Sequence, residues 1–155
     1  MLNKSEHECI NIRNLYRFIM NNEEYKYKDI VKQKLLVTSE KIFEEIVNKA
    51  SNFLIIDDNG SVHLKIPLTK LTQQQGIWLF LVGKYLAKMG KIIHDENASI
   101  AEIAHFLNSY EKRVRSRLSE LKQAGLVEPT KRGYYRIVYA RIPTLLDSLI
   151  TKEEF

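Results

Sequence analysis

The amino-acid sequence predicts an α+β fold that is mostly α-helical, in which three helices followed by a β-hairpin occur twice. Apolar residues recur with helical spacing over most of the chain, and in each half two β-prone segments flank a turn. The two halves also align as a weak internal repeat with an offset of about 72 residues. We therefore expect two domains in tandem, residues 1–67 and residues 72–155, joined by a short linker.

Composition indicates a globular protein of the cytoplasm. The 155 residues are 45% hydrophobic and 28% charged, and the single cysteine, Cys9, excludes an intrachain disulfide. The segment Met1–Glu8 is polar, which argues against a secretory signal. The longest apolar run, Ile77–Val82, is far shorter than the roughly 20 residues that cross a bilayer as a helix, so we expect no membrane partner.

The second half begins with a strongly apolar helix. Thr72 and Gln75 have the spacing of a capping box, which predicts a helix start, and Gly90 predicts its end. Apolar residues surround most of this helix, so it should be buried on more than one side. Such burial is met either by packing between small domains or by contact between two subunits.

Two shorter helices follow and are joined by a tight turn. Ser99 and Glu102 form a second capping-box pattern, and the turn lies at Asn108–Ser109, where either residue is expected to cap the next helix. That helix ends at Gly125. Its expected core face consists of Val114, Leu118 and Leu121.

A β-hairpin and a last helix complete this half. Leu126–Glu128 and Tyr134–Tyr139 read as strands around a turn at Pro129–Gly133, and an amphipathic helix is expected from Pro143 onward.

The stretch Ser99–Val127 resembles the winged helix-turn-helix of the MarR and ArsR types of prokaryotic transcriptional regulator. Val114, Leu118, Leu121 and the run Ala124–Val127 match the pattern, while Asn108 replaces the usual turn glycine. The resemblance spans about residues 72–141. It implies a winged-helix domain that binds DNA, with the hairpin as its wing.

The first half is then expected to be a degenerate winged helix. Its helices would be residues 12–19, 28–35 and 39–51, and its hairpin would join residues 53–56 to residues 62–66. On the third helix, Lys112, Arg113, Ser116 and Arg117 align with Glu40, Lys41, Glu44 and Glu45. Carboxylates beside phosphates oppose DNA binding, so this half is expected to serve dimerisation or partner binding.

Positive charge gathers in about a fifth of the chain. Residues 108–141 contain nine basic and three acidic side chains. We expect helix 110–124 to read the major groove and the wing, residues 129–136, to contact phosphates or the minor groove. The alternative is a solvated basic face on a protein-binding domain. The candidate DNA-binding residues are Ser109, Lys112, Arg113, Arg115, Ser116, Arg117, Lys131 and Arg132.

Nothing in the sequence indicates catalysis, a cofactor or a metal site. The chain has no glycine-rich phosphate loop and no Ser/His/Asp order, and His63, His94 and His105 lack ligand spacing. An enzyme is therefore not expected.

The expected function is a transcriptional regulator that binds duplex DNA as a homodimer, because such regulators read paired half-sites. A plasmid or viral replication initiator built from two winged helices would have the same architecture. A tandem winged-helix module that binds proteins, like those of ESCRT-II or of the segregation and condensation complex, is the alternative from another class. That module should lack salt-dependent DNA affinity.

Overall fold

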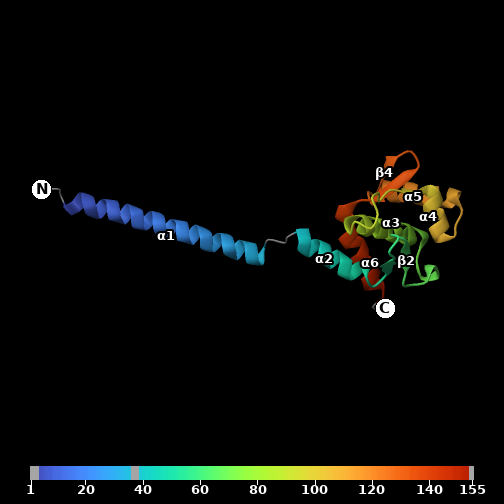
Figure 1. The fold of residues 1–155 in the computed structure, drawn as a ribbon, viewed down its shortest axis with the longest axis horizontal. Coiled ribbons are helices and arrows are strands. Elements are labelled where there is room, and N and C mark those ends of the chain that lie inside the picture. The colour runs from blue at the N-terminus through green and yellow to red at the C-terminus, as the bar shows by residue number, and fades with distance from the viewer. Residues whose placement is uncertain (1–3, 36–38, 154–155) are drawn as a thin grey trace. The chain divides into compact units, whose positions relative to one another are not determined.

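The computed structural model describes the backbone of residues 4–35 and 39–153, with all side chains except those of residues 4–13, 18, 22, 152 and 153. The chain divides into an N-terminal unit, Met1–Ile42, and a C-terminal unit, Phe43–Phe155. The described structure is mostly helical with small antiparallel sheets (Figure 1), which confirms the predicted α+β class.

The N-terminal unit consists of helix α1 (Lys4–Lys34) and the first residues of α2 (Ser39–Ala50). The expectation of two separate helices over residues 12–19 and 28–35 is wrong, because α1 continues through both segments. Residues 4–34 contain neither Gly nor Pro, so the strongest helix-breaking residues are missing between the two apolar clusters. Among the described residues, two helices therefore precede the first hairpin instead of three.

The first hairpin forms as predicted. Strand β1 (Leu54–Ile56) pairs antiparallel with β2 (Val62–Leu64). Asp57 shapes the turn, because its Oδ1 accepts the backbone N–H groups of Asn59 and Ser61, each at 2.9 Å. Gly60 supplies the positive φ of +82° that the turn requires.

The hairpin and the end of α2 belong to the C-terminal unit, so the expected boundary between residues 67 and 72 is not where the chain divides. Val62 packs against α3 (Gln73–Met89) so closely that a Cβ on Gly83 would lie 2.6 Å from a Val62 methyl carbon. The hairpin joins this unit because a two-stranded hairpin is only marginally stable by itself and must bury its apolar face against another element. The buried side chains that this segment adds to the shared core are Ile46, Ala50, Phe53, Leu54 and Val62.

Helix α3 is the central helix of the core and follows a short 3-10 turn, η1 (Leu68–Lys70). Its predicted capping box is confirmed: Thr72 Oγ1 accepts the Gln75 N–H at 3.2 Å, and Gln75 Oε1 accepts the Thr72 N–H at 2.9 Å. The buried large side chains of α3 are Ile77, Trp78, Leu79, Phe80, Leu81, Val82 and Leu86. Packing within one chain therefore accounts for the apolar residues on most sides of this helix.

The two predicted short helices are α4 (Ile100–Leu107) and α5 (Glu111–Gln123). Ser99 caps α4 by accepting the Glu102 N–H at 3.1 Å, and α4 ends at Asn108 in the left-handed region, with φ at 47°. The expectation that Ser109 or Asn108 caps α5 is wrong. The N-cap residue is Tyr110, whose phenol is too long for a local cap bond and makes none.

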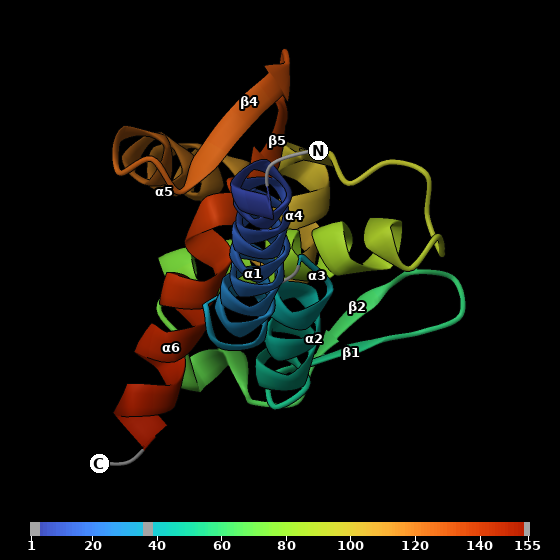
Figure 2. The same cartoon turned by 90° about the vertical axis from the view of Figure 1, so that its left-hand side faces the viewer.

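A three-stranded antiparallel sheet lies beside these helices in the order β3 (Ala98–Ser99), β5 (Tyr134–Ile137), β4 (Val127–Lys131). The β4–β5 turn is shorter than the expected Pro129–Gly133, because β4 continues to Lys131. Pro129 is tolerated because β4 is an edge strand and a register shift follows it. Figure 2 shows this hairpin projecting next to α5.

The chain ends with a 3-10 turn, η2 (Tyr139–Arg141), and helix α6 (Ile142–Glu153). Helix α6 returns to the core and starts one residue before the expected Pro143. Its buried side chains are Ile142, Leu145, Leu146 and Leu149.

Candidate functional site

Helix α5 presents a polar face that is exposed because its apolar residues all point into the core. Val114, Leu118 and Leu121 are 2% exposed or less. The exposed candidates on the opposite side are Lys112, Arg113, Arg115 and Ser116. Arg115 Nη2 lies 3.5 Å from Glu111 Oε2, and this ion pair is weak because both side chains are exposed. Among the described side chains of residues 39–151, no ion pair to Lys112 or Arg113 is found.

Arg117 differs from these residues because it is engaged by a carboxylate. Its Nη1 donates to both oxygens of Glu120 at 2.8 and 2.9 Å, and Gln74 on α3 donates to the same carboxylate. The hydrogen bonds from Arg117 and then Gln74 lower the pKa of Glu120 below its ordinary value. Arg117 is thus paired with a local carboxylate. The i,i+3 spacing of Arg117 and Glu120 is the sequence signal that could have found this pair, whereas the hydrogen bond from Gln74 depends on the packing of α3 against α5.

A shallow hollow of about 550 Å³ separates the start of α3 from α5. Arg113 and Arg117 line one side, and Thr72, Gln73 and Gln74 line the other. Ser109 is next to it: its Oγ accepts from Gln73 Nε2 at 3.0 Å, and its backbone N–H donates to Ala104. Ser109 therefore connects the α4–α5 turn to α3.

The β4–β5 hairpin supplies the remaining candidate cations. Lys131 and Arg132 are exposed at its turn, and Gly133 has φ at +78°. The Lys131 ammonium lies 4.2 Å from the centre of the Tyr134 ring, which favours a defined position for a long side chain. At the base of the hairpin, Arg136 Nε donates to Glu128 at 2.6 Å. Helix α5 and strand β4 are in contact, so the hairpin that carries the second group of candidates packs beside the helix that carries the first.

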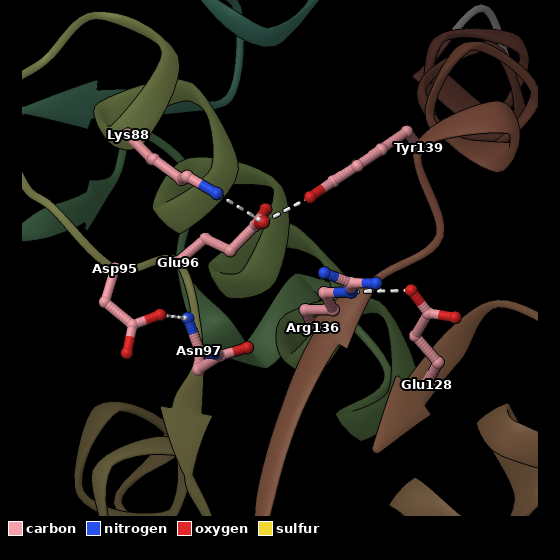
Figure 3. Close-up of polar contacts among 7 residues, drawn as sticks. All are labelled: Lys88, Asp95, Glu96, Asn97, Glu128, Arg136 and Tyr139. Carbon is pink, nitrogen blue, oxygen red and sulfur yellow. Dashed lines mark hydrogen bonds and ion pairs between the residues drawn. The ribbon is translucent and has the colours of Figure 1, made fainter. Parts of the chain in front are cut away.

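A buried carboxylate in the loop before β3 was not anticipated from the sequence. Glu96 is 2% exposed, and its Oε1 accepts from Lys88 Nζ at 3.1 Å and from the Tyr139 hydroxyl (Figure 3). The contacts connect α3, the loop before β3 and η2. Nothing in the polar stretch around residue 96 distinguishes a buried glutamate from a solvated one, because its burial depends on the later return of the chain.

We expect this cluster to make the free energy of unfolding fall as pH becomes alkaline. Burial and then the hydrogen bond to Glu96 raise the pKa of Tyr139 to about 12, whereas an unfolded tyrosine titrates near 10. The raised pKa stabilises the folded state fully below about pH 10, and this stabilisation is lost as pH rises toward about 12. Tyr139→Phe should therefore lose less unfolding free energy across that window than the native chain. Urea denaturation of both proteins at several pH values measures this, and equal pH slopes would contradict it.

Comparison with protein-family models, with curated proteins and with solved structures found no match for this chain. Across the helices of the described residues, none is long and apolar enough to span a membrane. In the same part of the chain, no three His, Cys, Asp or Glu side chains lie together as metal ligands.

Proposed function

We propose that this chain is a sequence-specific duplex DNA-binding protein that regulates transcription. The observation that carries the proposal is the exposed cationic face of α5 followed directly by a hairpin with exposed cations at its turn. Residues 108–141, which contain both, hold nine basic and three acidic side chains. A basic surface of this kind is the electrostatic footprint of nucleic-acid binding.

The order of elements supports a winged helix as the DNA-binding domain. Three helices, α3, α4 and α5, are followed by an antiparallel hairpin, and β3 between the first two helices completes the sheet. In such a domain the third helix enters the major groove and the hairpin reaches the backbone or the minor groove.

Each candidate residue takes a role according to its surroundings. Lys112, Arg113 and Ser116 are exposed on α5 and are proposed to contact base edges and phosphates, with Arg115 at the backbone. Because Glu120 holds Arg117, we assign Arg117 to orienting the helix against α3 and to a weaker contact with DNA. The wing cations Lys131 and Arg132 and the turn residue Ser109 are assigned to the phosphate backbone.

The proposal includes a homodimer, since paired half-sites require two-fold symmetry. Helices α3 and α6 bury their apolar sides within one chain, so we place the dimer contact on α1. Sedimentation of the free and DNA-bound chain tests this, and monomer in both conditions would contradict it. The exposed apolar side chains of α1, among those that the structure describes, are Leu15, Tyr16, Ile19, Met20, Tyr25, Tyr27, Ile30 and Val31.

Fluorescence anisotropy with labelled duplex DNA at several salt concentrations tests the function. If the chain neutralises several phosphates, the logarithm of its affinity should fall linearly with that of salt, with a slope of about −0.9 per phosphate. Titration against a pool of random duplexes, followed by sequencing of the bound fraction, should recover a preferred site. Absence of affinity at low salt would contradict DNA binding and would favour a protein-binding module.

A further inference from the structure

A pocket of about 510 Å³ lies on the C-terminal unit between the β1–β2 turn, α3 and α4. This volume is in the range of small-molecule sites, which run from roughly 300 to 1,000 Å³. Its wall at the turn is closely packed, because a Cβ on Gly60 would lie 2.2 Å from a methyl carbon of Ile93. The pocket therefore has defined walls contributed by three separate elements.

Part of the lining is apolar. The rings of Phe80 on α3 and Phe106 on α4 stack with their centres 4.5 Å apart, and Ile93 and Val62 lie beside them. These side chains favour an aliphatic or aromatic group of a ligand, because apolar surface is stabilised when it leaves water.

The charged part of the lining is a matched pair of opposite sign. Lys84 Nζ lies 2.8 Å from Glu102 Oε1, and the Lys84 side chain is 15% exposed while that of Glu102 is 40% exposed. A ligand with one negative group would take Lys84 and leave the Glu102 carboxylate without its partner. A ligand with one positive group would do the reverse, which costs more because the Lys84 side chain is the less exposed of the two.

A zwitterion avoids both costs, because its carboxylate can pair with Lys84 and its ammonium with Glu102. We propose that this pocket binds a free α-amino acid with an apolar side chain, whose head group inserts at the Lys84–Glu102 pair. The side chain then lies against Phe106 and Ile93. His63 and His105 stand at the rim, where His63 Nε2 is 2.9 Å from Asp57.

Occupancy of the pocket acts on α4, because the Lys84–Glu102 pair links α3 to the first turn of that helix. Helix α4 packs against α5, so a shift of α4 changes the position of the cationic face. This regulatory half of the inference rests on the proposed DNA-binding function, whereas the binding site itself does not.

Isothermal titration calorimetry of the full chain with L-leucine, L-methionine and L-phenylalanine tests the site. At least one of them should bind, and its analogue without the amino group or with an amide in place of the carboxylate should bind at least about tenfold more weakly. For leucine these analogues are 4-methylpentanoate and leucinamide. No binding by any of the three amino acids, or equal binding by both analogues, would overturn the proposal.

Variants locate the site and separate it from DNA binding. Lys84→Gln and Glu102→Gln should each lower the affinity for the amino acid by at least about tenfold. Lys65 is an exposed lysine outside the pocket, so Lys65→Gln should leave this affinity unchanged. Thermal melts verify that each variant folds, and the analogue series on the native chain decides the question if one does not. The calorimetry contains no DNA, so its result on the amino-acid site stands even if the chain does not bind DNA. An unchanged DNA affinity at saturating amino acid, against an expected change of roughly fivefold or more, would overturn the regulatory half.

Discussion

Replacing Lys112 and Arg113 together with alanine is expected to reduce duplex DNA affinity by roughly one to two orders of magnitude at low salt. Both side chains are exposed on α5 and have no ion pair among the described residues, so their full charge is available to phosphates or base edges. Each lost phosphate contact should also make the salt dependence shallower by about 0.9 in the double-logarithmic slope. Anisotropy titrations at several salt concentrations measure both quantities.

The matched control for this variant is the double replacement of Lys65 and Lys70 with alanine. Both lysines are exposed in the same unit and far along the chain from α5, and their loss changes the net charge by the same amount. The control should keep nearly all of the affinity and slope, because local contact and not total charge is at issue. Equal losses in the two variants would remove α5 as the reading helix.

Phe53→Ala is expected to destabilise the whole C-terminal unit by about 3–5 kcal/mol, the usual cost of truncating a buried Phe. Phe53 is 1% exposed and packs in the same core as α3 and α6, although it lies before the boundary that the sequence predicts. The loss should appear in one cooperative transition when denaturation is followed by the fluorescence of Trp78 on α3. The midpoint of this transition is compared between the native chain and the variant.

Truncation of an exposed apolar side chain to alanine provides the comparison. Ile55 is the neighbour of Leu54 on β1 and is 51% exposed, so Ile55→Ala should change stability far less. If Phe53→Ala instead left the Trp78 transition unchanged, the hairpin and α3 would belong to independent folding units.

The pattern of apolar residues was sufficient to predict the elements of the second half. The capping residues Thr72 and Ser99 and the triplet Val114, Leu118 and Leu121 act within one or two helical turns. Their effect is local, so sequence spacing reveals it. The same is true of the first hairpin, whose turn depends on Asp57 and Gly60.

Predictions that depended on more distant contacts were less successful. The helical break between residues 19 and 28 was inferred from the repeat, but the local sequence contains no residue that ends α1. Likewise, β3 is two residues long and forms because β5 pairs with it, an interaction between positions that lie more than 30 residues apart. Periodicity does not report such a pairing.

The candidate site divides in the same way. By itself the sequence determined which side chains of α5 point outward, and how positive charge is distributed, because these follow from helical geometry and composition. Tertiary structure alone decided that Gln74 shares the Glu120 carboxylate with Arg117, that Glu96 is buried beneath Lys88 and Tyr139, and that the first hairpin shares the core of α3. The reason is physical: burial and ion pairing depend on groups that are brought together only when the chain packs.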